Sequence, residues 1–183
     1  MLLVRDDVKR DIKLTDKQSA DLDALREDMQ EKMRDLFQSQ MGSGGGRPDF
    51  EKMRTLMDPI MKEVKEKTEK ILEPAQQTRL KQIWIQLSGS QVITNEEMQK
   101  ELKMEAPQVE KVKELQKKQG AAMAELRQKV QAGELQREEM RDLMKKNGDI
   151  MKTELGKVLT DKQREQLKGM EGPKFTPDPE DGN

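Results

Sequence analysis

The sequence predicts an all-α fold, and three observations support this prediction. Apolar residues recur at spacings of three and four along most of the chain, which is the period of one helix face. No apolar alternation with a period of two, as expected for a β-strand, competes with this pattern. Only 32% of the 183 residues are hydrophobic and 39% are charged, so the apolar stripes are narrow. Because a narrow stripe buries one face of a helix, we expect thin helical layers rather than a thick core.

The chain contains an internal repeat that groups the helices into two units. The aligned stretches are residues 6–18 with 96–108, residues 51–57 with 138–144, and residues 72–76 with 159–163. The first copy has three extra residues in a glycine-rich loop at 41–48, where added length costs little closure entropy. We therefore expect a first unit at 1–88, a linker at 89–92 and a second unit at 93–170.

Each unit is expected to contain a short helix, two long helices and another short helix. In the first unit, the apolar stripes of the long helices are Leu22, Leu25, Met29, Met33 and Leu36, and Phe50, Met53, Met57, Ile60, Val64 and Ile71. In the second unit, they are Val109, Val112, Leu115, Met123 and Leu126, and Leu135, Met140, Leu143, Met144, Met151 and Val158. The last helix of the first unit carries the densest apolar patch of the chain, which consists of Leu80, Ile83, Trp84 and Leu87.

Four related pentapeptides mark helix starts. They are LTDKQ at 14–18 and 159–163, LEPAQ at 72–76, and MEAPQ at 104–108. In LTDKQ, the Thr hydroxyl accepts from the third helical amide, and the Gln side chain accepts from the amide of the capping Thr, which together form a capping box. In the other two, Glu takes the cap position and Pro falls in the first turn, where its missing donor costs little. We expect these motif residues to fix helix ends: Leu14, Thr15, Gln18, Leu72, Gln76, Met104, Gln108, Leu159, Thr160 and Gln163.

The composition excludes most kinds of active site. Cys and His are both absent, which removes disulfides, thiolate nucleophiles, Ser-His or Cys-His catalytic pairs and imidazole metal ligands. The GSGGG sequence is followed by Arg47 and Pro48 rather than by the Lys-Ser/Thr pair of a phosphate-binding loop. We therefore predict no catalytic residues, no metal site, no cofactor and no enzyme activity.

Charge and hydropathy limit the partners. The 35 Lys and Arg residues nearly balance the 36 Asp and Glu residues, and no basic stripe carries interleaved aromatic residues. A nucleic-acid partner is therefore not expected. No stretch approaches the ~18 apolar residues of a membrane helix, so no membrane span is expected either.

The 14 methionines are the most unusual compositional feature. Their flexible side chains either fill an irregular helical core or line an adaptable surface for unrelated partners. A thioether site for Cu(I) is a third interpretation, which no Cys or His supports. Trp84 either packs between the two units or stays exposed as an interaction site. The candidate partner-binding residues are Met29, Met33, Met53, Met57, Met61, Met140, Met144 and Trp84.

The last segment of the sequence, EGPKFTPDPEDGN at 171–183, has a different composition. It contains three prolines, and its four acidic residues against Lys174 give it a net charge of −3. Such a segment cannot bury enough apolar surface to offset its conformational entropy. We predict that residues 171–183 form a disordered acidic tail.

Four LTxxQ-like pentapeptides in a charged, Met-rich helical chain resemble the Spy and CpxP family of periplasmic proteins. The resemblance covers roughly residues 3–170. Members of this family carry two such motifs each, and the resemblance implies a thin, curved cradle of the kind formed by a dimer. Since each unit of this chain carries two motifs, the chain resembles a fused, pseudo-twofold counterpart of that dimer. We therefore expect a monomer with two tandem Spy-like four-helix units.

The resemblance also implies a function. We expect an ATP-independent chaperone that holds unfolded or partly folded client proteins in the periplasm. The alternative is a CpxP-like accessory of the envelope stress response that docks to a membrane sensor protein. Both functions imply that a leader peptide was removed from the precursor.

Overall fold

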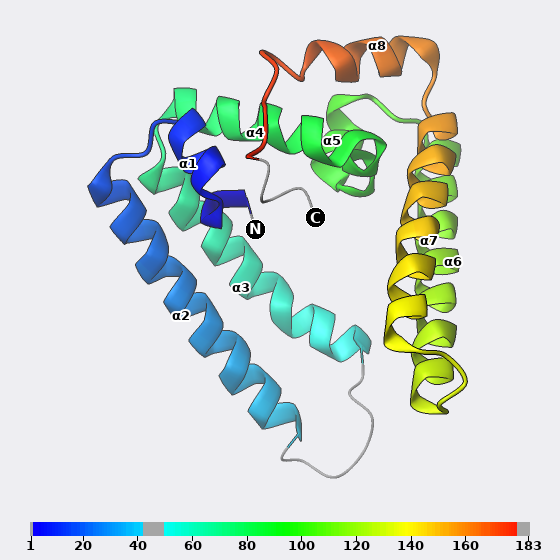
Figure 1. Ribbon diagram of the computed structural model, residues 1–183. Helices are drawn as coiled ribbons and strands as arrows, with labels where there is room; N and C mark the ends of the chain where they lie inside the picture. The colour runs from blue at the N-terminus through cyan, green and yellow to red at the C-terminus, as the bar shows by residue number, and fades with distance from the viewer. Residues whose placement is uncertain (1, 42–49, 179–183) are drawn as a thin grey trace. The chain divides into compact units, whose positions relative to one another are not determined.

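The computed structural model describes residues 2–41 and 50–178, apart from the side chains of residues 40, 41 and 50–54. All regular elements in these ranges are helices, so the all-α prediction is confirmed (Figure 1). The glycine-rich loop predicted at 41–48 falls almost entirely outside the described residues. With 3-10 helices written η, the elements are η1 (Leu2–Val4), α1 (Asp6–Asp11), α2 (Asp16–Met41), α3 (Phe50–Ile71), α4 (Pro74–Ser88), η2 (Gly89–Thr94), α5 (Glu96–Glu101), α6 (Ala106–Gln131), α7 (Arg137–Val158) and α8 (Asp161–Gly169).

The chain divides into two compact units. Unit 1 comprises Met1–Lys81 together with Phe175–Asn183, and unit 2 comprises Gln82–Lys174. The boundary between them lies inside α4. The residues expected to form a linker belong to η2, in which Val92 and Ile93 are fully buried. Because these two side chains are part of the apolar cluster of unit 2, this stretch has a packing role in addition to a connecting one.

The first three α-helices of the two units correspond in length and burial, whereas α4 has 15 residues and α8 has 9. α1 and α5 have six residues each, α2 and α6 have 26, and α3 and α7 have 22. Aligned positions are also buried together: Val8 and Met98, Ile12 and Leu102, Leu22 and Val112, Leu25 and Leu115, Val64 and Met151, and Leu72 and Leu159. These correspondences support the internal repeat. The pseudo-twofold relation and the Spy-like cradle stay predictions.

The turn between the two first helices has the same backbone in each unit. Lys13 and Lys103 lie in the left-handed region, with φ values of 54° and 49°. In each turn, the N–H of the next residue donates to the carbonyl five residues before it, at 3.0 Å in unit 1 and 2.9 Å in unit 2. This hydrogen bond closes the helix end. A non-glycine residue in this conformation costs about 1 kcal/mol, so the tight connection from short to long helix is strained in both units.

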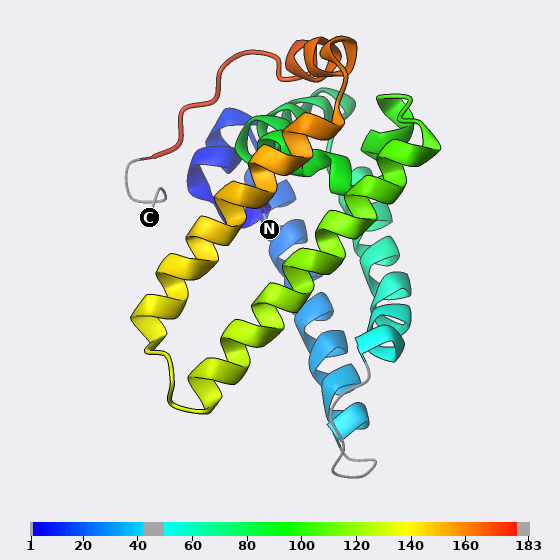
Figure 2. The same ribbon diagram turned by 90° about the vertical axis from the view of Figure 1, so that its right-hand side faces the viewer.

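The long helices of each unit pack as an antiparallel hairpin. α2 lies along α3 in unit 1, and α6 lies along α7 in unit 2 (Figures 1 and 2). No helix in the described ranges is both long enough and apolar enough to cross a membrane. The core of unit 2 is a cluster of Ile85, Val92, Ile93, Met98, Leu102, Val112, Leu115, Met151, Leu155, Leu159 and Leu167. Trp84, Met104, Val158 and Met170 pack against this cluster.

The segment after α8 differs from the disordered tail that its composition predicts. Residues 171–178 have no helix, yet Gln86 donates two hydrogen bonds, of 2.6 and 2.8 Å, to backbone carbonyls near the start of the segment. Further along, Phe175 is buried with 6% of its surface exposed. Composition describes the average of a segment, whereas burial of one aromatic side chain is enough to hold it locally. The remainder of the predicted tail, residues 179–183, lies outside the described residues.

Candidate functional site

The four motif glutamines meet in two pairs, one in each unit. In unit 1, Gln18 is in the first turn of α2 and Gln76 is in the first turn of α4. Gln18 Nε2 donates to Gln76 Oε1 at 2.7 Å, and Gln76 Nε2 donates to Gln18 Oε1 at 3.0 Å. The two side-chain amides therefore face each other in a reciprocal arrangement. We call this the glutamine pair of unit 1.

Each glutamine of this pair also contacts the ends of other helices. Oε1 of Gln18 and of Gln76 accepts from the backbone N–H of its own cap residue, at 3.1 and 2.9 Å. Gln18 Nε2 donates to the Ile71 carbonyl at 2.9 Å. Gln76 Nε2 donates to the carbonyls of Ile12 and Lys13 at 3.2 and 3.1 Å. The pair thus ties the starts of α2 and α4 to the ends of α3 and α1.

The glutamine pair of unit 2 has the same hydrogen bonds. Gln108 Nε2 donates to Gln163 Oε1 at 2.8 Å, and Gln163 Nε2 donates to Gln108 Oε1 at 3.1 Å. Their Oε1 atoms accept from the cap residues at 2.9 and 3.0 Å. Gln108 reaches the Val158 carbonyl at 2.7 Å, and Gln163 reaches the Leu102 carbonyl at 3.2 Å. This pair joins the starts of α6 and α8 to the ends of α7 and α5.

This arrangement supports a structural role for the motif. A neutral side-chain amide is neither a nucleophile nor a strong acid or base, and these amides use both donor and acceptor atoms within the protein. Gln163 is buried at 8% exposure, and the other three glutamines are half-buried. Buried polar groups are costly unless they are hydrogen-bonded, so the pairs stabilise the point where four helix ends meet.

The remaining motif residues surround the two pairs. The threonine hydroxyls of Thr15 and Thr160 accept from the backbone N–H three residues later, at 3.2 and 3.3 Å. Both threonines are exposed. The apolar residues before the caps are buried at Leu72 and Leu159 and half-buried at Leu14 and Met104. Each motif therefore places an apolar side chain in the core and a polar cap at the surface.

The pairing of the glutamines goes beyond the capping box, which explains each helix start by itself. A capping box accepts Glu as well as Gln at its third helical position. All four motifs nevertheless carry Gln at this position. An amide is required here because each side chain must donate a hydrogen bond as well as accept one. The presence of Gln rather than Glu at this position in all four motifs is the feature of the sequence that indicates the glutamine pairs.

The candidate partner-binding residues occupy different environments. Met61 and Met144 are exposed, with 51% and 37% of their surfaces accessible. The half-buried ones are Met29, Met33, Met57, Met140 and Trp84, the last of which packs on the cluster of unit 2. The side chain of Met53 lies outside the described part of the chain. The methionine stripes thus run along the edge of each hairpin, between core and surface.

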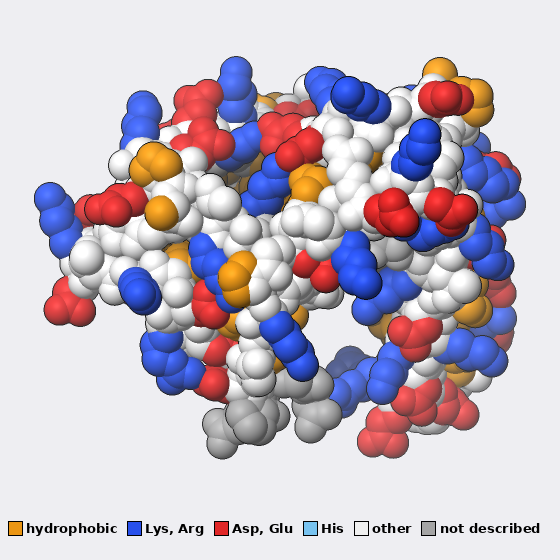
Figure 3. Space-filling model, turned by 90° about the horizontal axis from the view of Figure 1, so that it is seen from above, with side chains coloured by type: hydrophobic (Ala, Val, Ile, Leu, Met, Phe, Trp, Pro, Cys, Tyr) orange, Lys and Arg blue, Asp and Glu red, His pale blue; other side chains and the backbone are white. Residues whose placement is uncertain are grey.

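Further large apolar side chains are exposed on the hairpins. In unit 1, Phe37 on α2 is 50% exposed, in addition to Met61 on α3. In unit 2, Leu143 and Ile150 on α7 are 38% and 53% exposed, next to Met144. Figure 3 shows such apolar side chains in small groups among interspersed basic and acidic ones. We call these five residues the exposed apolar set; they are Phe37, Met61, Leu143, Met144 and Ile150.

Unit 1 has a network of four charged side chains across its hairpin. Lys32 Nζ lies 2.8 Å from Glu63 and 3.1 Å from Asp28, while Lys67 Nζ lies 2.7 Å from Glu63 and 3.3 Å from Asp28. The pKa values of Asp28 and Glu63 are lowered by hydrogen bonds from the two ammonium groups. The hydrogen bond from Lys32 has the largest effect and that from Lys67 the next largest. The pKa of each lysine is raised, chiefly by its hydrogen bond to Glu63. Because all four groups face solvent, the network fixes geometry more than it adds stability.

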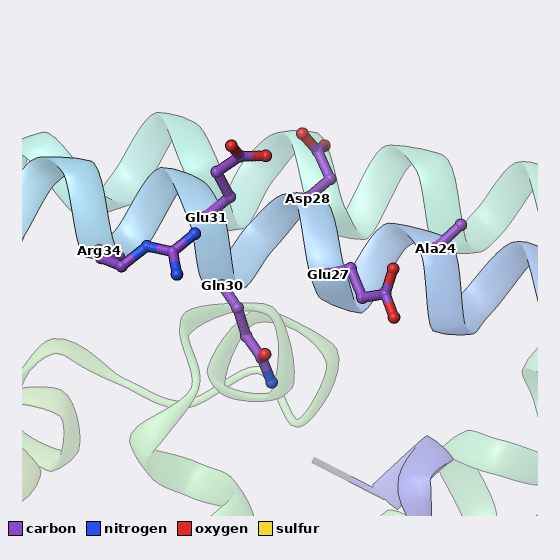
Figure 4. A pocket seen from close by; sticks show the side chains of 6 residues that line it. All are labelled: Ala24, Glu27, Asp28, Gln30, Glu31 and Arg34. Atoms are coloured by element: carbon purple, nitrogen blue, oxygen red, sulfur yellow. The ribbon is translucent and has the colours of Figure 1, made fainter.

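The hollow beside α2 is lined mostly by charged and polar side chains of that helix. Its walls are the side chains of Ala24, Glu27, Asp28, Gln30, Glu31 and Arg34. Asp28 and Glu31 project from one side of the helix, while Glu27 and Gln30 project from another (Figure 4). Within the described residues, no three His, Cys, Asp or Glu side chains come together in a way that could hold a metal ion.

Comparison of the chain with protein families, with curated proteins and with solved structures found no match. The interpretation of function therefore depends on the residues and contacts of this chain and on the resemblance carried by its four motifs.

Proposed function

We propose that this protein binds unfolded or partly folded segments of other proteins and holds them without ATP, as a Spy-like chaperone of the periplasm. The observation that carries the proposal is the exposed apolar set on the two hairpins. In a surface that is otherwise densely charged, large exposed apolar side chains that share one helix, such as Leu143 and Ile150 on α7, are candidate contacts for a partner. The resemblance of the four LTxxQ-like motifs supports the same function and the same compartment.

The form of this surface suits weak and varied binding. The exposed apolar set is spread over two hairpins rather than gathered in one deep pocket. Burying apolar surface contributes roughly 25 cal/mol per Å², so each of these residues adds a modest amount of binding free energy. Methionine adapts its shape to different neighbours because its side chain is unbranched and flexible. The hairpins can therefore bind many unfolded sequences without selecting one of them.

The charged residues around the apolar set complement it. Basic and acidic side chains are intermingled on the face that Figure 3 shows, and the whole chain has a formal net charge of −1. Such a surface does not select clients by one sign of charge. We propose that its charges keep the protein soluble and allow clients to leave, while apolar contacts provide the affinity.

The proposal is tested by adding the purified chain to a chemically unfolded protein that aggregates on dilution, and by recording light scattering. We expect suppression at a several-fold molar excess without ATP. A triple variant with Leu143→Gln, Met144→Gln and Ile150→Gln should suppress aggregation less. The matched control carries Gln116→Ala, Gln128→Ala and Gln131→Ala, three exposed polar positions on the neighbouring helix α6.

The outcomes separate the proposed functions. No suppression by the natural sequence would refute the chaperone function. Tight binding of one folded sensor domain, with no effect on general aggregation, would instead favour the CpxP-like accessory. Equal suppression by the triple variant and its control would show that the exposed apolar residues of unit 2 are not client contacts.

A further inference from the structure

The surface of α1 in unit 1 carries a carboxylate that is arranged to accept hydrogen bonds. Asp7 is 4% exposed. Its Oδ1 accepts from Val8 N–H at 2.8 Å and from Arg5 Nε at 3.0 Å, and its Oδ2 accepts from Arg5 Nη2 at 2.5 Å. The hydrogen bond from Arg5 is the main reason that the pKa of Asp7 falls to about 2. This side chain is therefore an ionised, buried acceptor at the start of α1.

The segment after α8 is seated on this surface in extended form. The backbone N–H of Asp178 donates to Asp7 Oδ2 at 3.1 Å. Arg10 Nη2 donates to both carboxylate oxygens of Asp178, at 2.8 and 2.6 Å. Three residues earlier, Phe175 is buried and belongs to unit 1. The contacts that hold this segment thus include a buried aromatic side chain, a backbone hydrogen bond to Asp7 and an ion pair with Arg10.

These contacts resemble those of a bound peptide more than those of a helix packed in the core. Residues 174–178 have no regular secondary structure, and Pro177 lacks the backbone N–H that a helix or strand would use at this position. Phe175 is its one buried side chain. The side chains of Arg10 and Asp178 are 67% and 42% exposed, so their ion pair is weak. A segment held in this way opens more readily than the helices beneath it.

We propose that the α1 surface of unit 1 is a docking site for an extended client segment with an aromatic residue followed three positions later by an aspartate, and that Phe175–Asp178 occupies it as an internal competitor. This inference rests on the proposed function for the identity of the natural partner. The aromatic side chain fills the space of Phe175, the backbone N–H binds Asp7, and the carboxylate binds Arg10. Unfolded chains expose such sequences, whereas folded proteins bury the aromatic residue.

The test uses a fluorescent peptide with the sequence of residues 171–178, EGPKFTPD, and measures its anisotropy with the full-length protein. In the release variant, Phe175→Ala and Asp178→Ala weaken the internal segment. We expect saturable binding to this variant, with a dissociation constant on the order of 0.1 mM for so small a contact. The natural sequence should bind the peptide about tenfold more weakly, because a tethered competitor acts at a concentration on the order of 1 mM.

Three controls test whether the anisotropy change depends on the contacts of Phe175, Arg10 and Asp178. A peptide with Ala in place of Phe should not bind. Adding Arg10→Ala to the release variant should weaken binding about threefold, as expected for an exposed ion pair. The single variant Asp178→Ala changes a partly exposed residue, so it retains the fold and should bind the peptide with intermediate affinity.

Two results would overturn the proposal. The first is absence of peptide binding to the release variant and to Asp178→Ala when both have the circular dichroism spectrum of the natural sequence. The second is equal binding to the release variant and the natural sequence. In the aggregation assay, the release variant should outperform the natural sequence. If peptide binding is present but suppression is unchanged, the docking site does not serve clients, while suppression by the natural sequence still upholds the chaperone function.

Discussion

Unit 1 and unit 2 place different side chains at aligned positions of their hairpins. Lys32 and Glu63 belong to the charged network of unit 1, and the corresponding positions of unit 2 are Ala122 and Ile150. Ile150 is 53% exposed, so an apolar side chain of unit 2 stands where unit 1 has a carboxylate, while Lys118 and Glu154 keep a charge at the positions aligned with Asp28 and Lys67. The glutamine pairs and the left-handed lysines are nevertheless the same. The comparison shows that the hydrogen bonds between helix ends are the same in both units, while the residues on the hairpin surfaces differ.

The interior of the hairpins differs as well. Leu155 on α7 is fully buried in the cluster of unit 2. The aligned residue of unit 1 is Thr68, which is half-buried and donates through its hydroxyl to the Val64 carbonyl at 2.7 Å. Apolar packing along the long helices therefore extends further in unit 2 than in unit 1.

The largest expected effect comes from this interior difference. Leu155→Ala should lower the free energy of unfolding by about 3 kcal/mol, since it leaves a cavity in a closely packed cluster. Thr68→Ala should cost about 1 kcal/mol or less, because it removes one hydrogen bond of a half-buried side chain. Urea unfolding checks both, with Trp84 fluorescence as the probe of unit 2 and far-ultraviolet circular dichroism as the probe of both units. Equal costs would remove the distinction between the two interiors.

The next effect concerns the glutamine pairs. Gln163→Ala should cost about 2 kcal/mol, because it removes a cap and leaves one N–H of the half-buried Gln108 amide without its partner. Gln18→Ala should cost about 1 kcal/mol, since its pair is more accessible to water. The exposed Gln116→Ala serves as the control and should leave unfolding unchanged. If Gln163→Glu unfolds like the natural sequence, the requirement for a donating amide is wrong.

A smaller effect is the dependence of the stability of unit 1 on pH. The pKa of Asp7 is lowered from 3.8 to about 2 by its hydrogen bond to Arg5, and Asp7 is the buried carboxylate among the described residues. A carboxyl group with a lowered folded-state pKa stabilises the fold fully above its unfolded-state value and loses this contribution as pH falls toward 2. Unit 1 should therefore lose stability between about pH 4 and pH 2, and Asp7→Asn should reduce this dependence, leaving the part that comes from other carboxylates with a lowered pKa, such as Asp28 and Glu63. Thermal melts over this pH range test the expectation.

The smallest expected effect on stability comes from exchanging aligned residues on the surfaces of the two hairpins. Exchanging the aligned residues by Glu63→Ile and Ile150→Glu should change stability little, because Ile150 is exposed and the half-buried Glu63 side chain is accessible to solvent at its ion pairs. The loss from Glu63→Ile should disappear at about 1 M salt, where the screening length is roughly 3 Å. Melts at low and high salt provide the measurement. A large loss that persists in salt would show that the network holds the hairpin together.

Much of the fold followed from the sequence because its signals are local. The capping boxes mark where α2 and α8 begin, and stripes such as Leu22 and Leu25 show the faces that are buried. The left-handed turns at Lys13 and Lys103 had no such signal, since lysine does not favour that conformation. Here the helix packing on either side determines the backbone.

The candidate site was harder to predict because its contacts join distant parts of the chain. Periodicity placed Met29 and Met61 on helices, but it does not distinguish the edge of an apolar stripe from its centre, and the two differ in exposure. The burial of Phe175 was hidden by the polar, proline-rich composition around it. The partners of that segment lie 168 and 171 residues away in sequence, at Arg10 and Asp7.

Carrying both copies in one polypeptide has a consequence for how this protein can change. In a homodimer, every mutation of the gene appears in both subunits, so a glutamate in one subunit and an isoleucine at the same position of the other cannot evolve side by side. Here, Glu63 and Ile150 are encoded by separate codons and can be selected independently. Duplication within one gene therefore allows the two hairpin surfaces to differ at aligned positions while the contacts between helix ends stay the same.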